Sequence, residues 1–282
     1  MSRPLVGGQA LIEGVMMKGP KKIAWAARKP NGRIVTHSFR WKSIAMSGVF
    51  SLPFLRGIVF LFEMLVIGMK ALTWSASQQD EEETLGKWEL ALTIVISLCL
   101  ALLIFVGIPY IAAWFAVGPT PTSVHFNIFD GIVRLALFIG YIWAIGLTKD
   151  IRRLFQYHGA EHMAVHCHEA ALPMTVKNVK KFSTIHPRCG TSLLVYVIGI
   201  SIVAFSLIRT DVWYYNVLLR LLIVPLIGGV GYELLRLAAR NEKNKLLWVL
   251  ALPGKLTQRM TTRKPDGKQI EVAIASLKAA MR

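Results

Sequence analysis

Residues that could bind a metal are concentrated in one short part of this 282-residue chain. Five of the seven histidines lie between positions 158 and 186, and the first two, His158 and His162, stand in the string HGAEH with Glu161 between them. H-x-x-E-H is the inverted zincin motif, in which two histidines one helical turn apart bind a metal and the glutamate acts as a base. We expect any chemistry of this chain to take place here.

The segment 149–171 is predicted to be a helix, and its geometry selects further candidates. At ~100° per residue, His158, His162 and Glu169 fall within about 40° of one another, and Glu161 lies about 60° to one side. Two nitrogens and two carboxylates therefore share one face, which suits a divalent metal, and zinc first of all. A catalytic zinc site keeps one position open for a water whose pKa falls to about 7. We expect His158 and His162 to be ligands and Glu161 to be the general base.

A catalytic zinc site needs a third protein ligand, and the sequence offers several candidates. Glu169 is the nearest, while His186 and Cys189 could return to the site from beyond the predicted helix. Glu13 and Glu63 are accessory candidates from outside this part of the chain. Glu13 lies in a glycine-rich opening segment, so it could enter the histidine site, or it could belong to a strand and turn packed beneath the helices.

The composition is that of an integral membrane protein. Hydrophobic residues make up 54% of the chain, and several apolar runs reach the roughly 20 residues that a membrane-spanning helix needs. The net charge of +17 is typical of cytoplasmic flanks that face anionic lipid headgroups, and no nucleic-acid recognition module accompanies it. The four clearest predicted spans are residues 90–117, 128–148, 190–208 and 212–237.

A fifth apolar segment, residues 50–75, carries an arginine, a glutamate and a lysine at seven-residue spacing, which places all three near one helical face. The first 49 residues hold nine Lys or Arg and the 149–189 segment holds seven, so both are predicted to be cytoplasmic. Two segments on the same side require an even number of crossings between them. We therefore expect 50–75 to be an interfacial, re-entrant or bundle-packed helix, in a multi-pass protein of the cell (inner) membrane with both termini cytoplasmic.

The two ends of the chain contain similar turn signals. Residues 23–40 alternate around Asn31-Gly32, and residues 256–275 alternate around Asp266-Gly267. Both dipeptides favour tight hairpin turns, so a small cytoplasmic β sheet built from an N-terminal and a C-terminal hairpin is predicted. The expected organisation is a β segment over 1–49, a mainly α membrane domain over 50–253 with the histidine-rich segment inside it, and a β hairpin with a tail over 254–282.

Four strings resemble the YqhQ-type bacterial membrane proteins, a family of unknown function catalogued as predicted metal-dependent enzymes. They are GGQALIEGVMM (7–17), YHGAEH (157–162), FSTIHPRCGTS (182–192) and QIEVAI (269–274). The resemblance covers nearly the whole chain and implies a metal-dependent activity. The chain departs from the family pattern at Met163 and over 165–168, which weakens His166 and His168 as shared ligands. Both also lie off the favoured face, and we expect them to be exposed to solvent.

The leading interpretation is a metal-dependent hydrolase whose site opens at the cytoplasmic membrane interface, acting on a peptide or a lipid-linked ester. The alternative is a membrane scaffold or assembly factor, in which the cluster holds a structural metal with four protein ligands or forms a polar network. A transporter would need ionisable residues deep in several spans, for which Arg134 and Arg220 are the main candidates. The expected partners are a bilayer with anionic headgroups and a membrane-associated substrate, without nucleic acid.

Overall fold

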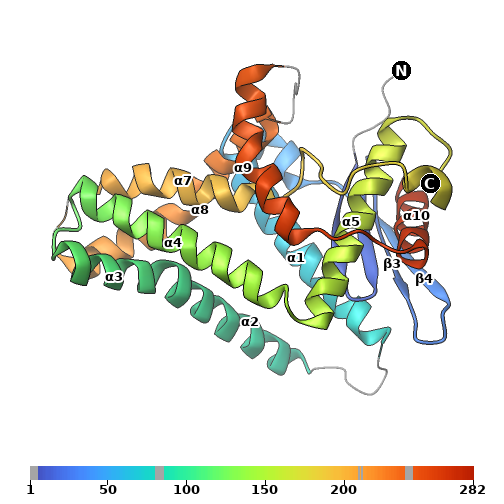
Figure 1. Cartoon of the computed structure of the whole chain (residues 1–282), viewed down its shortest axis with the longest axis horizontal. Helices are drawn as coiled ribbons and strands as arrows, with labels where there is room; N and C mark the ends of the chain where they lie inside the picture. Colours follow the sequence, from blue (N-terminus) through green and yellow to red (C-terminus); the bar gives the residue numbers. More distant parts are fainter. Residues whose placement is uncertain (1–5, 80–85, 209, 211, 239–243) are drawn as a thin grey trace.

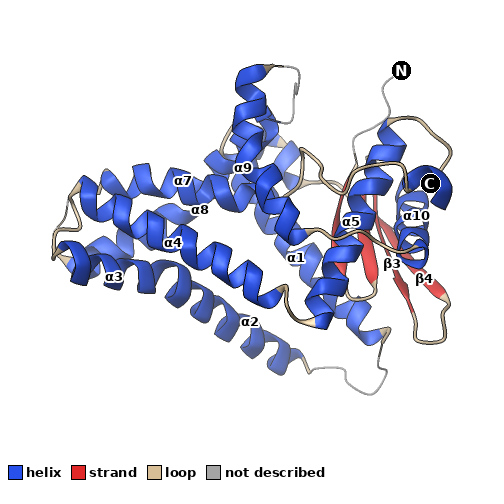
Figure 2. Cartoon of the chain, in the orientation of Figure 1, coloured by secondary structure: helices blue, strands red, loops and turns tan. Residues whose placement is uncertain are grey.

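A computed structural model describes residues 6–79, 86–208, 210, 212–238 and 244–282. Long helices lie side by side at one end of the molecule and a small sheet lies at the other (Figures 1 and 2). The sheet is an antiparallel meander with its four strands in sequence order. Its strands are β1 (Gly7–Leu11), β2 (Gly14–Lys18), β3 (Lys22–Arg28) and β4 (Ile34–Arg40).

The N-terminal hairpin predicted over 23–40 is confirmed as β3 and β4. Gly32 has a φ of 83°, a left-handed conformation that glycine adopts without steric cost. The side-chain oxygen of Asn31 accepts a hydrogen bond from the backbone N–H of Arg33 at 3.0 Å and so closes the turn.

Three helical stretches among the described residues are long and apolar enough to cross a membrane, namely Ala91–Val117, Val124–Ile145 and Trp213–Ala238. The remaining predicted span, 190–208, corresponds to a shorter apolar helix, Thr191–Ser206. The helices are α1 (Leu55–Ser77), α2 (Lys87–Leu102), α3 (Ile108–Val117), α4 (Val124–Ile145), α5 (Lys149–Glu169), α6 (Val176–Val179), α7 (Thr191–Ser206), α8 (Trp213–Ala238), α9 (Lys245–Thr261) and α10 (Gly267–Met281), with a π turn over Leu103–Gly107 between α2 and α3 and 3-10 turns over Ile44–Met46 and Gly48–Ser51.

The C-terminal hairpin predicted over 256–275 is wrong, because this part of the chain forms α9 and α10. Asp266 is the N-cap of α10, where its carboxylate accepts the backbone N–H of Gln269 at 2.7 Å. The side chain of Gln269 accepts the backbone N–H of Asp266 in return at 2.9 Å. This capping box starts a helix at the dipeptide that was interpreted as a hairpin turn.

The sheet lies between helices on both faces. Its strand residues alternate, so that Val15, Met17, Ala24 and Ala26 pack against α5 and α10. The opposite side chains, Leu11, Met16, Ile23 and Trp25, pack against α1. This sandwich fixes α5, which carries HGAEH, on a rigid support.

Two charged residues of α1, Arg56 and Glu63, have partners within the protein. Arg56 donates two hydrogen bonds to Glu233 of α8, at 2.6 and 2.5 Å. Glu63 accepts hydrogen bonds from the hydroxyl of Ser43 at 2.5 Å and the backbone N–H of Ile44 at 2.6 Å. Arg56 is therefore directed at α8, and Glu63 at the segment that precedes α1.

A charged cluster is buried inside the long helices. Asp130 of α4 pairs with Arg134 of the same helix at 2.7 Å and with Arg220 of α8 at 3.3 Å. All three side chains are at most 7% exposed. The guanidiniums also donate to neutral side chains, Arg134 to Ser201 and Arg220 to Asn127 and Asn216. Two cations thus share one carboxylate in an apolar bundle.

Candidate metal centre

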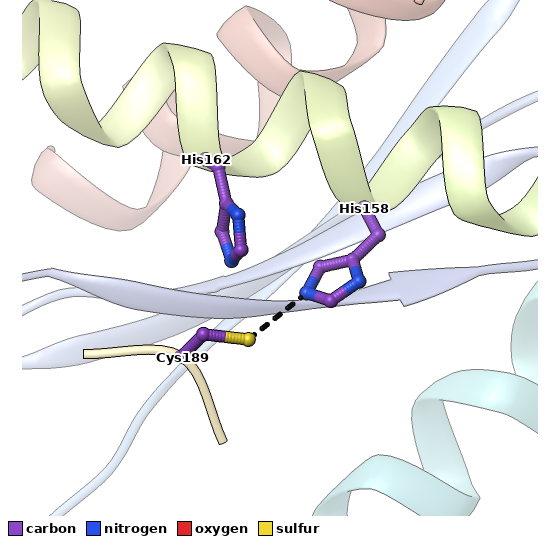
Figure 3. Close-up of side chains that lie close together, drawn as sticks. All are labelled: His158, His162 and Cys189. Atoms are coloured by element: carbon purple, nitrogen blue, oxygen red, sulfur yellow. Dashed lines mark hydrogen bonds between the residues drawn. The ribbon is translucent and has the colours of Figure 1, made fainter. Parts of the chain in front are cut away.

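The helix that carries HGAEH is held between the sheet and the C-terminal part of the chain. α5 begins at Lys149, after a short turn that separates it from α4, and it packs on β1, β2 and α10. The opposite side of α5 presents His158 and His162 to the loop that ends at Cys189 (Figure 3). The helix predicted over 149–171 is thus observed, two residues shorter than expected.

His158, His162 and Cys189 form a group whose candidate ligand atoms all lie within 4.8 Å of one another. The Nε2 atom of His158 is 3.2 Å from the sulfur of Cys189. His162 is 2% exposed and Cys189 is 7% exposed. Two imidazoles and one thiol therefore converge in a space that is largely closed to solvent, and this donor set suits zinc.

Backbone carbonyls orient both imidazoles of this group. The Nδ1 atom of His158 lies 2.9 Å from the carbonyl of Thr261, and that of His162 lies 2.5 Å from the carbonyl of Thr184. A carbonyl only accepts hydrogen bonds, so each neutral imidazole carries its proton on Nδ1 and has a lone pair on Nε2. Burial lowers the pKa of His162, which keeps its ring neutral. Metal-binding histidines are typically fixed in this way by a second hydrogen bond.

The sulfur of Cys189 has polar partners at the start of α7. It lies 3.1 Å from the hydroxyl oxygen of Thr191 and accepts the backbone N–H of the same residue at 3.5 Å. Cys189 immediately precedes Gly190, the N-cap of α7, where the helix dipole attracts negative charge. The thiolate is the form of cysteine that binds metals.

Glu161 lies beside the group without belonging to it. Its Oε2 atom is 3.4 Å from the Nε2 atom of His162, and the residue is 4% exposed. Burial raises the pKa of its carboxyl group, while a hydrogen bond from the backbone of Gly8 opposes that rise. A Cβ atom on Gly8 would lie 2.7 Å from Cγ of Glu161, so the glycine of β1 allows this close approach.

Two of the predicted ligands lie in a second group. His166, Glu169 and His186 also have ligand atoms within 4.8 Å of one another. The Nε2 atom of His186 is 3.3 Å from Glu169, which also pairs with Arg188. Glu169 and His186 were the first candidates for the third ligand beside His158 and His162. In the structure Cys189 lies at that position. His166 is only partly exposed and His168 is buried, so the expectation that both face solvent is wrong.

The accessory candidates Glu13 and Glu63 lie elsewhere. Glu63 accepts hydrogen bonds from Ser43 and Ile44, as described above. Glu13 follows β1 and accepts hydrogen bonds from Arg153 and, at 3.1 Å, from the hydroxyl of Tyr157. Burial and the neighbouring carboxylate both raise the pKa of Tyr157. Glu13 therefore anchors α5 one turn before His158, and its ligand atoms are in neither group.

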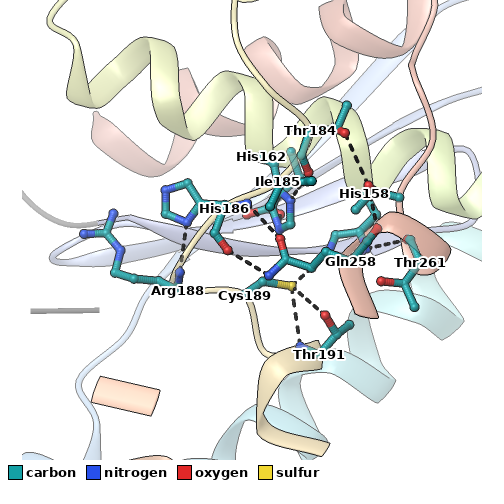
Figure 4. A network of polar contacts seen from close by, with 12 residues as sticks. His158, His162, Thr184, Ile185, His186, Arg188, Cys189, Thr191, Gln258 and Thr261 are labelled. Atoms are coloured by element: carbon teal, nitrogen blue, oxygen red, sulfur yellow. Dashed lines mark hydrogen bonds and ion pairs between the residues drawn. The ribbon is translucent and has the colours of Figure 1, made fainter. Parts of the chain in front are cut away.

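Sequence reasoning missed Gln258 of α9, which is fully buried. Its amide accepts the backbone N–H of His186 at 2.7 Å and donates to the carbonyl of the same residue at 2.9 Å (Figure 4). It also donates to Ser192 at 3.3 Å. The sequence pattern places Gln258 in a hairpin predicted over 256–275. In the structure it lies on a helix, α9, and this helix faces the loop that carries His186.

We expect Gly159→Ala to destabilise the site. A Cβ atom on Gly159 would collide with the carbonyl oxygen of Arg263 and lie 3.1 Å from Thr184, so α5 and the chain after α9 would have to separate. The expected cost is about 1–3 kcal/mol, measured as a lower thermal unfolding midpoint in detergent. Gly140→Ala in α4 is the matched control, because its Cβ would meet open space. Equal unfolding midpoints for the two variants would contradict the close contact.

Comparisons with known proteins identify the family. A family profile described as "Protein of unknown function (DUF1385)" matches residues 52–282. The chain is 32% identical over 295 residues to the "Uncharacterized protein YqhQ" of Bacillus subtilis (strain 168), an alignment that covers 99% of this chain and 93% of that protein. No solved structure matches. The chain therefore belongs to the DUF1385 family of YqhQ-type proteins, as its four characteristic strings predicted.

Proposed function

We propose that this protein is a membrane-embedded, metal-dependent hydrolase, with zinc held by His158, His162 and Cys189. The observation that carries the proposal is the convergence of two Nε2 atoms and one sulfur, with each Nδ1 atom bonded to a backbone carbonyl. Three protein ligands leave a zinc ion one open position, which is typical of catalytic rather than structural sites. Cys189 replaces Glu169 and His186 as our choice of third ligand.

Glu161 is the proposed general base. When bound, the metal would polarise the scissile carbonyl and lower the pKa of water to about 7. The Oε2 atom of Glu161 lies 3.4 Å from His162 Nε2, beside the proposed ligands, where it would accept a proton from water. Burial raises the pKa of its carboxyl group, which makes the carboxylate a stronger base.

We further propose that the site lies at the cytoplasmic face of the cell membrane. In this topology α2 with α3, α4, α7 and α8 make four crossings, α1 does not cross, and both termini are cytoplasmic. Exposed apolar side chains support contact with the bilayer, including Val49 before α1 and Trp248 and Val249 on α9. Basic residues of the same regions would meet anionic headgroups. The substrate class is a membrane-associated peptide or a lipid-linked ester.

The function is tested with full-length, zinc-loaded protein in lipid vesicles and two generic probes, p-nitrophenyl acetate for ester cleavage and a fluorogenic casein peptide for peptide cleavage. We expect turnover of one probe, and we expect Glu161→Gln to keep its zinc while turnover falls by about 10²–10⁴-fold. Cleavage of neither probe above the rate of empty vesicles would contradict the proposal.

The second candidate is a scaffold with a structural metal, and it is favoured by the burial of Glu161 beside His162. If Glu161 were a fourth ligand, coordination would be closed. The same variant separates the two candidates. Glu161→Gln would then lower the zinc content, and the unmodified protein would cleave neither probe.

A further inference from the structure

We infer that the centre is binuclear, with a second divalent metal held by His166, Glu169 and His186 next to the first. The inference rests on the metal site of the proposed function but not on hydrolysis. It assigns a role to a group of side chains that the first site does not use.

The donor atoms of the second group converge within the same distance as those of the first. One nitrogen from each histidine and one oxygen from Glu169 lie within 4.8 Å of one another, and a metal here would replace a contact that His186 makes with Glu169 or with the backbone N–H of Arg188. Two imidazoles and a carboxylate are the ligands of many divalent metal sites. His166 and Glu169 come from the last turns of α5, and His186 comes from the loop that Gln258 clamps, so all three are held by ordered backbone.

The two groups are adjacent. Ring centroids are 4.4 Å apart for His158 and His162, 5.7 Å for His162 and His186, and 4.4 Å for His186 and His166. The four imidazoles therefore form a continuous row along α5 and the facing loop. Such a row offers imidazole nitrogens to two neighbouring divalent metals.

Charge in the row is also suited to two cations. Glu161 is buried, its Oε2 atom lies 3.4 Å from the Nε2 atom of His162, and the ring centroid of His162 is 5.7 Å from that of His186 in the second group. Glu169 supplies a second carboxylate, whose cationic partner in the structure is Arg188. A metal at the second group would compete with the Arg188 guanidinium for Glu169. Replacing Arg188 should therefore leave the second metal in place.

The test measures bound zinc by mass spectrometry after metal-stripped, full-length protein in detergent is dialysed against zinc. We expect two equivalents in the unmodified protein, one in His166→Ala and in Glu169→Gln, and two in the control Arg188→Gln. The remaining equivalent in the first two variants shows that the first site is still folded.

The outcomes separate the second site from the first. One equivalent in the unmodified protein that persists in Glu169→Gln would overturn the second site and leave the first intact. No zinc in the unmodified protein would overturn both sites. Two equivalents in the unmodified protein and also in Glu169→Gln would overturn the ligand assignment.

Discussion

His162→Ala is expected to lower the affinity of the first site for zinc by more than about 100-fold. Loss of a residue that merely orients a ligand typically costs 10–100-fold, so loss of a ligand itself should cost more. The Nε2 atom of His162 also lies 3.4 Å from Glu161 Oε2, and its ring centroid is 5.7 Å from that of His186, so the variant interrupts the row of imidazoles. The measurement is a competition titration of the purified protein with a fluorescent zinc chelator.

His125→Ala is the matched control, because His125 is exposed on α4 and belongs to neither group. It should keep the zinc affinity of the unmodified protein. Equal affinities for His162→Ala and His125→Ala would show that His162 is not a ligand.

Asp130→Asn is expected to produce the largest loss of stability. The substitution keeps the size of the side chain but removes the carboxylate that pairs with both Arg134 and Arg220, and all three side chains are buried. Leaving a buried charge without its partner costs about 3–5 kcal/mol. We expect a clearly lower thermal unfolding midpoint in detergent.

The control for this variant is Asp150→Asn in the first turn of α5, where the carboxylate is exposed. There the loss of charge should cost only about 0.3–1 kcal/mol through the helix dipole. If Asp130→Asn unfolded at the temperature of the control, charge neutralisation would not explain the cluster.

Local patterns predicted the parts of the fold that depend on neighbouring residues. The helix around HGAEH follows from its sequence between α4 and Pro173, and the β3–β4 hairpin follows from alternation around Asn31-Gly32. Apolar length predicted the long helices of the bundle. In each case the relevant interactions lie within about one helical turn or one strand pair.

The C-terminal prediction failed because two local signals compete at the same dipeptide. Asp-Gly suits a hairpin turn, but Asp266 followed by Gln269 is also a capping box. Ile270, Ala273 and Leu277 are buried in the core with α5 and the sheet, and only a helix places them on one face. The packing partner decides the conformation, and it lies far away in the sequence.

The third ligand could not be selected from spacing alone. Cys189 reaches His158 because the chain after α5 folds back along it and Gln258 of α9 holds the loop in place. His166 lies about 80° from His158 around the helix, and the predicted face excluded it. The loop that faces α5 places His186 beside His166, with ring centroids 4.4 Å apart. The second group therefore depends on the course of this loop, which the spacing of residues along the helix does not predict.

Zinc K-edge X-ray absorption tests the central claim most directly, with full-length protein loaded with less than one equivalent of zinc. We predict one sulfur ligand at ~2.3 Å and imidazole nitrogens at ~2.0 Å, with the sulfur lost in Cys189→Ser. A first shell of nitrogen and oxygen alone in the unmodified protein would contradict the His158, His162 and Cys189 centre.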